Sequence, residues 1–169
     1  HDGGKLYHPG GQTGGKFWML GTMDGAGLLF VAEGFATAAT VFEATGRPCA
    51  VAYSASNLVP VTGALRELHG AQQDIIIVAD NDKSGTGQKY ADQASAKYGA
   101  RVVMPPIEGM DANDYVQAGH DLLRIPPHRA GAQRGPGDGW ALSDGGGGGV
   151  SGTLCVSGEG RAQPARGGR

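Results

Sequence analysis

The chain has 169 residues, enough for one ordinary domain with a buried core. Its 14 Lys and Arg stand against 16 Asp and Glu, and this net charge of −2 excludes the histone-like binding of nucleic acid that depends on surplus cations. No apolar run is long enough for a membrane span. The two cysteines, Cys49 and Cys155, lie too far apart for a metal-binding spacing. We therefore expect a cytoplasmic protein with no membrane partner and with Cys49 buried.

Both ends of the chain are rich in glycine. Residues 1–27 form a Gly-rich segment in which one short strand is expected, at 16–20. Residues 126–169 form a Gly/Pro/Arg-rich tail that we expect to be disordered, because glycine runs hold almost no backbone conformation. The tail has two interpretations: a flexible linker, or GC-rich DNA translated in a shifted frame. The chain starts at His1 without a methionine, and a fragment of a longer protein is one interpretation of this start.

Between residues 28 and 125, short apolar runs alternate with stretches of good helix formers. Strands with little polar alternation, separated by helices, are typical of a parallel sheet that is covered on both faces. We predict a three-layer α/β domain over residues 28–125, with about four parallel strands and helices on both faces. The predicted strands are 28–32, 49–54, 74–80 and 101–105, and the predicted helices are 33–46, 57–70, 85–99 and 111–123. Asn57 is a plausible N-cap of the second helix, and Gly46 and Gly99 stand at helix ends.

Polar residues follow every predicted strand at its carboxyl end, where open parallel sheets bind their ligands. The four sets are Glu33; Ser54, Ser56 and Asn57; Asp80, Asn81 and Asp82; and Asp111, Asn113 and Asp114. Carboxylates at one edge repel each other unless a cation lies among them, and hard divalent cations prefer oxygen ligands. Asp80 and Asp82 are therefore candidate ligands of Mg²⁺ or Mn²⁺, and Glu33 is a candidate general acid/base or further ligand.

Each of these acids also has an ordinary structural interpretation. Asp82 could cap the helix that follows it, and Asp111 could cap the last helix. Glu33 is harder to explain in this way. A glutamate directly after an apolar strand is partly buried, and burying a charge without a partner is costly.

The stretch "SGTGQK" at 84–89 invites comparison with a phosphate-binding loop. It lacks the spacing of the Walker A motif, so we do not expect a nucleotide-binding P-loop. Gly85 and Gly87 would instead let the backbone bend close behind a metal site. Lys89 is more typical of a solvated helix residue and is a weak candidate for binding nucleotide or nucleic acid.

Two motifs resemble those of toprim domains. "VAEGFATAATVFEATG" at 31–46 is similar to the first toprim motif, a glutamate after the opening strand, and "VADNDKSGTGQKYA" at 78–91 is similar to the second, a DxD followed by a glycine. Together with "GMDANDY", they make residues 16–123 most similar to the toprim domains of plasmid- and phage-borne DNA primases and primase-helicases.

The resemblance implies roles for individual residues. Glu33 matches the family's acid/base or metal-binding glutamate, and Asp80 and Asp82 match its metal-binding pair. Asp111 and Asp114 match an additional acidic site, and Lys16 is a weak candidate for contacting template or nucleotide phosphates. Ser54 stands where many relatives carry an acid, which implies a weaker metal site in this chain.

The resemblance also implies a function: Mg²⁺- or Mn²⁺-dependent synthesis of RNA primers from nucleoside triphosphates on single-stranded DNA. The setting would be plasmid or phage replication in a bacterial or phage-infected cell, with a replicative helicase as a further partner. Two alternatives keep the same fold. One is phosphodiester cleavage, as in toprim nucleases and topoisomerases, and the other is a truncated, non-catalytic toprim module.

Overall fold

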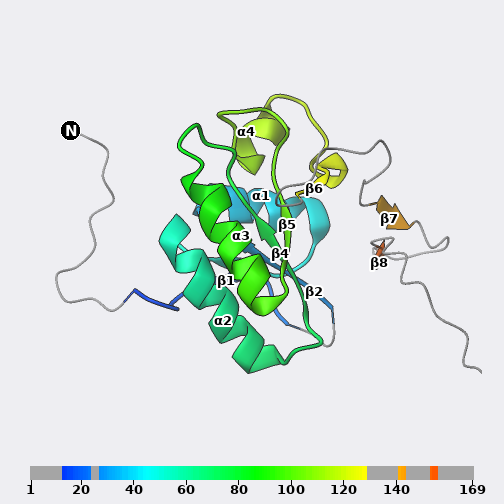
Figure 1. Ribbon diagram of the computed structural model, residues 1–169. Helices are drawn as coiled ribbons and strands as arrows, with labels where there is room; N and C mark the ends of the chain where they lie inside the picture. Colours follow the sequence, from blue (N-terminus) through cyan, green and yellow to red (C-terminus); the bar gives the residue numbers. More distant parts are fainter. Residues whose placement is uncertain (1–12, 24–26, 129–140, 144–152, 156–169) are drawn as a thin grey trace, which may run out of the picture.

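A computed structural model describes residues 13–23, 27–128, 141–143 and 153–155 of the chain (Figure 1). Our expectations for residues 1–12, for most of the tail and for the Cys155 side chain lie outside the described residues. The strand expected at 16–20 is present as β1 (Trp18–Leu20). Two further short strands, β7 (Ala141–Ser143) and β8 (Thr153–Cys155), pair with each other in a separate two-stranded sheet.

The main sheet has six strands in the order β1-β3-β2-β4-β5-β6. The four inner strands are the four predicted ones, and they pair in parallel as expected. The count of about four was too low, because β1 and β6 add one antiparallel strand at each edge. The bounds of the other main-sheet strands are β2 (Leu28–Ala32), β3 (Cys49–Val51), β4 (Asp74–Val78), β5 (Arg101–Val103) and β6 (Pro127–His128).

Helices cover both faces of the sheet, which confirms the predicted three layers. Figure 1 shows α2 and α3 side by side on one face and α1 behind the sheet on the other. None of the helices in the described part of the chain is long and apolar enough to cross a membrane. The helices are α1 (Phe35–Thr45), α2 (Leu58–His69), α3 (Thr86–Tyr98) and α4 (Ala112–Gln117), with single 3-10 turns at Ala55–Asn57 and Leu122–Arg124.

The alternation of side chains along the strands divides the core into two layers. Phe30 of β2 packs with α1 and α4, whereas its neighbours Leu29 and Val31 pack with α2 and α3. All five residues of β2 are buried, which explains why this strand shows no polar alternation in the sequence. A fully buried side chain of this size contributes roughly 1.5–3 kcal/mol to folding, so the central strands anchor both layers.

Two predicted elements are shorter than expected. The strand predicted at 49–54 ends at Val51, because Tyr53 has a left-handed backbone with φ of 68° and leaves the pleated conformation. The helix predicted at 111–123 ends at Gln117, where Gly119 turns the chain with φ of 87°. Glycine provides this conformation without the steric cost that other residues incur.

The predicted burial of Cys49 is confirmed, and burial raises the pKa of its thiol to about 12. Because the thiolate is the reactive form, we expect the Cys155→Ser variant, whose single thiol is Cys49, to react about 10³-fold more slowly with a thiol reagent at pH 8 than an unperturbed cysteine does. Absorbance with a disulfide reagent measures this rate. Fast reaction before denaturant is added would contradict the buried position.

Candidate functional site

The register of the inner strands brings two of the predicted polar sets to one edge of the sheet. In the parallel pair of β2 and β4, Ala32 lies opposite Val78. Glu33 therefore leaves β2 one residue beyond this pair, and Asp80 leaves β4 two residues beyond it. We call Glu33, Asp80 and Asp82 the carboxylate edge. All three are half-buried, so their charges are only partly exposed to solvent.

Asn81 holds the loop between Asp80 and Asp82 in place. Its backbone N–H donates to the carbonyl of Met110 (3.1 Å), and its own carbonyl accepts from the N–H of Gly109 (2.6 Å). Its side-chain amide donates to the carbonyl of Pro105 (2.9 Å). These three bonds tie the loop to the segment that follows β5. They hold the backbone between the two aspartates in place.

Asp82 is held in its ionised form by hydrogen bonds at the start of α3. The hydroxyl of Ser84 donates to its Oδ1 (2.5 Å) and the N–H of Gly87 to its Oδ2 (3.3 Å). The Ser84 bond is the main cause of a lowered pKa of this carboxyl, backbone N–H groups lower it further, and partial burial opposes them. The N-cap position of α3 is Gly85, not Asp82, but Asp82 still bonds the first turn of the helix, and these bonds preserve the charge that a metal ligand needs.

Gly87 lets α3 approach the carboxylate edge closely. A Cβ atom added there would lie 3.2 Å from the backbone oxygen of Asp80 and 3.5 Å from Oδ2 of Asp82. Contacts as short as the first are tighter than most real Cβ contacts. The expectation that a glycine makes room behind Asp80 and Asp82 is therefore supported at Gly87. Oδ1 of Asp80 is a buried atom for which no hydrogen bond is seen within the described residues, although the side chain does take part in other interactions.

The carboxylate edge is not a preassembled cluster of three metal ligands. Within residues 13–23 and 27–128, no three His, Cys, Asp or Glu side chains are grouped so that they could hold a metal ion. Mg²⁺ is commonly held by one or two carboxylates, with waters and substrate phosphates as its other ligands. A site of that open type needs only the oxygens of Asp80 and Asp82, and their role as metal ligands stays a prediction. The role of Glu33 stays a prediction.

Glu33 is tied through its backbone to the end of β3. Its carbonyl oxygen accepts a hydrogen bond from the N–H of Tyr53 (2.7 Å). The left-handed conformation that Tyr53 adopts costs a residue with a Cβ of order 1 kcal/mol. The surrounding structure offsets this cost at Tyr53, the residue at which the chain turns away from Glu33. The backbone conformation of Tyr53 is therefore imposed by its surroundings and not by its own preference.

Asn57 has a different role from the predicted one. It stands at the N-cap position of α2, but its side chain makes no capping hydrogen bond. The buried amide instead accepts from the N–H of Gly15 (2.8 Å) and donates to the carbonyls of Lys16 (2.9 Å) and Ala52 (2.7 Å). It clamps the segment before β1 against the end of β3, which brings the backbone of Lys16 to the same edge as Glu33. The sequence shows only a polar residue after β3, and we had interpreted Asn57 as the N-cap of the following helix.

The remaining candidates lie in different surroundings. Asp111 is the predicted N-cap of α4, and its Oδ1 accepts from the N–H of Asp114 (2.8 Å). Asp114 is exposed in the first turn of that helix, and an additional acidic site at this pair stays a prediction. Lys16 and Lys89 are both exposed, and the ammonium of Lys89 lies 5.8 Å from the ring centroid of Tyr90. A surface position is what we expected of Lys89.

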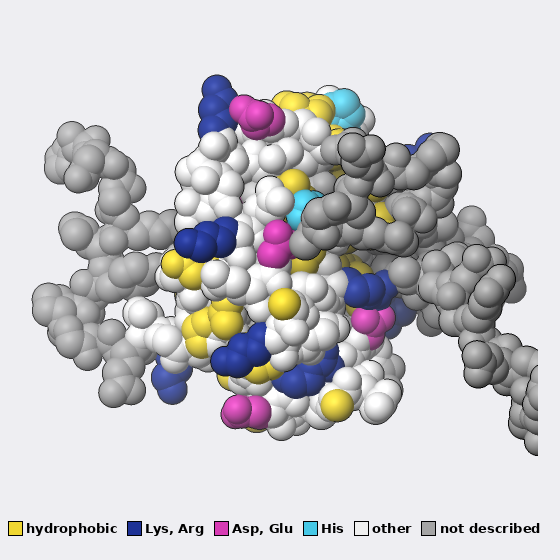
Figure 2. Space-filling model, in the orientation of Figure 1, with side chains coloured by type: hydrophobic (Ala, Val, Ile, Leu, Met, Phe, Trp, Pro, Cys, Tyr) yellow, Lys and Arg dark blue, Asp and Glu magenta, His cyan; other side chains and the backbone are white. Residues whose placement is uncertain are grey.

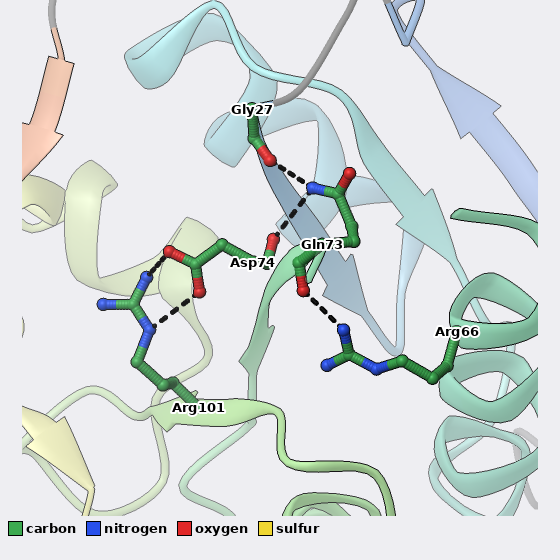
Figure 3. Close-up of polar contacts among 5 residues, drawn as sticks. All are labelled: Gly27, Arg66, Gln73, Asp74 and Arg101. Carbon is green, nitrogen blue, oxygen red and sulfur yellow. Dashed lines mark hydrogen bonds and ion pairs between the residues drawn. The ribbon is translucent and has the colours of Figure 1, made fainter. Parts of the chain in front are cut away.

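The opposite end of β4 carries a different kind of polar group. Figure 3 shows Asp74, the first residue of β4, paired with Arg101 at the start of β5, while the Gln73 side chain bonds the carbonyl of Gly27. Arg66 of α2 bonds the carbonyl of Gln73 (2.5 Å). Here the acid, Asp74, is paired with a cation of the chain itself. This end therefore serves to join the strands, in contrast to the carboxylate edge.

The toprim domain family matches residues 28–121, more than half of the chain. The chain belongs to the toprim domain family. The match spans the inner strands and the whole carboxylate edge, in agreement with the resemblance of the two motifs. The toprim chain is also 31% identical over 114 residues to a protein described as DNA primase TraC from Escherichia coli, covering 62% of the chain and 11% of that protein. A second protein of that description and organism is 31% identical over 136 residues, 75% of the chain and 9% of that protein.

The similarity covers only a small part of each relative. The toprim chain spans about a tenth of the length of the curated relatives it matches. No solved structure matches it at a significant level. The family and the fold are therefore shown for this domain, whereas the activity of a whole primase is a matter for proposal.

The Asn57 clamp can be tested by its contribution to stability. We expect Asn57→Ala to lower the free energy of unfolding of the toprim chain by about 1–3 kcal/mol, because it leaves buried backbone groups without their partners. Urea denaturation followed by circular dichroism measures the change. Ser56→Ala, which alters an exposed neighbour, is the matched control and should differ from wild type by less than about 0.5 kcal/mol. Equal stability of the two variants would argue against the clamp.

The hydrogen bonds to Asp82 predict a pH dependence. The pKa is lowered in the folded state from its ordinary 3.8, so ionised Asp82 stabilises the fold above that pH, and this stability is lost as pH falls through the lowered pKa. In a metal-free buffer, Asp82→Asn should be less stable than wild type at pH 7, and the difference should shrink below about pH 4. Thermal melts across pH 2.5–7 test this. A difference that grows on acidification would contradict the assignment.

Proposed function

We propose that this toprim chain carries the catalytic edge of a metal-dependent nucleotidyl transferase that makes RNA primers on single-stranded DNA from nucleoside triphosphates. Membership of the toprim family and similarity to proteins described as DNA primases support the proposal. The observation that carries it is the parallel register of β2 and β4, which sets Glu33 beside the strand end that bears Asp80 and Asp82.

Asp80 and Asp82 are the residues that would hold Mg²⁺ or Mn²⁺. Both offer carboxylate oxygens, the donors that hard divalent cations prefer. The pKa of Asp82 is lowered, so it is charged at neutral pH, and Asn81 keeps the loop between the two at a defined position. A divalent cation bound there would neutralise phosphate charge and lower the pKa of an attacking hydroxyl.

Glu33 would act on the proton of the attacking 3′-hydroxyl. A general base must come within hydrogen-bond reach of the proton that it removes, and Glu33 leaves the strand adjacent to that of Asp80. Its backbone bond to Tyr53 fixes the origin of the side chain. Asp80 and Asp82 would meanwhile orient the substrate phosphates, so that positioning and electrostatics supply most of the rate enhancement, as is usual in phosphoryl transfer.

The proposal extends to partners that lie beyond this domain. Single-stranded DNA would be the template and nucleoside triphosphates would be the substrates. A replicative helicase would be a further partner in plasmid or phage replication. With a net charge of −2, the chain has no overall surplus of cations to attract DNA. On the face that carries α2 and α3, Lys and Arg are interspersed with acidic and hydrophobic side chains (Figure 2). DNA affinity would then depend on bound cations and local contacts.

Primer synthesis by the chain on a single-stranded template with Mg²⁺ or Mn²⁺ tests the proposal. We expect Asp80→Asn to lower the rate by about 10²-fold or more, the loss typical of removing one electrostatic stabiliser. Asp74→Asn is the matched control, since it removes a carboxylate from the other end of the same strand. Gel analysis of labelled products measures the rates, and Mn²⁺ binding by electron paramagnetic resonance provides a second readout that does not depend on activity.

The outcomes separate the functions that share this fold. Primer synthesis that is lost in Asp80→Asn and kept in Asp74→Asn supports the proposal. Cleavage of DNA without synthesis would favour a toprim nuclease. Mn²⁺ binding that needs Asp80 and Asp82, in a chain that makes no primers and cleaves nothing, would identify a truncated module. Equal activity of Asp80→Asn and wild type would refute the assigned site.

A further inference from the structure

Exposed aromatic side chains lie on the same edge of the sheet as Glu33. Within the described residues, the large apolar side chains that are most exposed to solvent are Trp18 (59%), Phe35 (55%), Tyr53 (43%), Leu68 (68%) and Ile107 (37%). The three aromatic ones all lie at the carboxyl-terminal edge of the inner strands: Trp18 opposite the last residue of β3, and Phe35 and Tyr53 just after β2 and β3. Phe35 follows Glu33 by two residues, and Tyr53 bonds the Glu33 carbonyl (2.7 Å). We call Trp18, Phe35 and Tyr53 the aromatic shelf.

The pairing of β1 places Trp18 on the α1 side of this edge. Trp18 lies opposite Val51, the last residue of β3, so its side chain points to the same face of the sheet as that of Val51. Val51 packs in the core layer that includes Ala38 and Val41 of α1. β1 is the outermost strand of the main sheet, and the Trp18 side chain is 59% exposed (Figure 1).

A contact lower on the same face shows how Trp18 and Phe35 are aligned. A Cβ atom added to Gly21 would lie 2.7 Å from Cε2 of Phe42, so the chain directly after β1 touches α1 at that ring. Going back from Gly21 to Trp18 covers about 10 Å of strand. Going back from Phe42 to Phe35 covers two helical turns, also about 10 Å, and returns to the same side of α1. Both steps lead to the carboxyl-terminal edge, so Trp18 and Phe35 belong to the same end of this face.

Tyr53 completes the shelf on the side of Glu33. Its backbone is left-handed, an uncommon conformation for a residue with an aromatic side chain, and its ring is 43% exposed. Glycine would fit the same turn without strain.

We propose that the aromatic shelf stacks the bases of single-stranded DNA and guides the strand past the carboxylate edge, an inference that rests on the proposed function. Aromatic side chains in a row bind single strands with little regard to sequence, because every base has a π-face. Lys16, exposed two residues before Trp18 and held by the Asn57 clamp, supplies a cation for the strand's phosphates. The shelf thus provides the local contacts that a chain with a net charge of −2 needs.

A single-tryptophan protein can report contact with the shelf directly. Trp140→Phe leaves Trp18 as the one tryptophan of the 169-residue chain. Titration with an oligothymidylate of about ten nucleotides, in EDTA, should quench its fluorescence, because a stacked base quenches an indole. An abasic oligomer of the same length carries the phosphates without the bases and should leave the fluorescence unchanged.

Affinities measured by fluorescence anisotropy with the same labelled oligothymidylate test each ring. We expect Trp18→Ala and Phe35→Ala each to weaken binding about tenfold, and Trp18→Phe to retain most of it. Tyr53→Gly should weaken binding while keeping or raising thermal stability, which separates loss of the ring from loss of the fold. Leu68→Ala is the matched control, since it removes an equally exposed apolar side chain from the far end of α2 and should change nothing.

Each outcome tests DNA binding by the aromatic shelf independently of catalysis. Binding is measured without metal, so the readout does not depend on the proposed metal ligands. Weaker binding by the shelf variants in a chain that makes no primers would support the shelf and count against the proposed function alone. Shelf variants that bind like Leu68→Ala, or an abasic oligomer that binds as tightly as oligothymidylate, would overturn the inference and identify these rings as a contact for another protein domain.

Discussion

The parallel pairing of β2 with β4 is the constraint on which the rest of this domain depends. Five consecutive residue pairs, from Leu28–Asp74 to Ala32–Val78, fix where each strand ends relative to the other. Side chains beyond the last pair must therefore emerge together, and these are Glu33 and the Asp80–Asp82 loop. A slip of one residue would turn every buried side chain of β2 to the wrong layer. The hydrophobic core thus determines the position of the polar edge.

Acidic side chains are stabilised in different ways at the two ends of the sheet. At the amino-terminal end, Asp74 meets Arg101, and the acid and the base satisfy each other within the fold. At the carboxyl-terminal end, backbone N–H groups and a serine hydroxyl keep Asp82 ionised, and no lysine or arginine of the described residues forms an ion pair with it within 4 Å. A carboxylate that is ionised and has no ion pair of this kind attracts external cations. The contrast between the two ends agrees with a site that is completed by something the protein binds.

Much of this architecture could be predicted from the sequence, because it follows from local patterns. The apolar run at 74–80 and glycines such as Gly46 and Gly99 at helix ends marked the inner strands and helices, and the toprim motifs marked the site. The edge strands were harder to predict, since β6 has only two residues and pairing decides whether they form a strand. The early end of β3 and the function of Asn57 depended on tertiary contacts: an unusual backbone at Tyr53, and two backbone carbonyls and one N–H brought together from distant segments.

Gly87 determines how closely α3 can approach the Asp80 loop. The 3.2 Å between its unoccupied Cβ position and the Asp80 carbonyl oxygen means that even a methyl group would push helix and loop apart by a few tenths of an ångström. A folded domain absorbs such a shift readily. Metal–oxygen bonds do not, because their lengths are confined to within about 0.2 Å. For the metal site proposed at Asp80 and Asp82, the missing side chain of Gly87 would therefore matter more than it does for the stability of the domain.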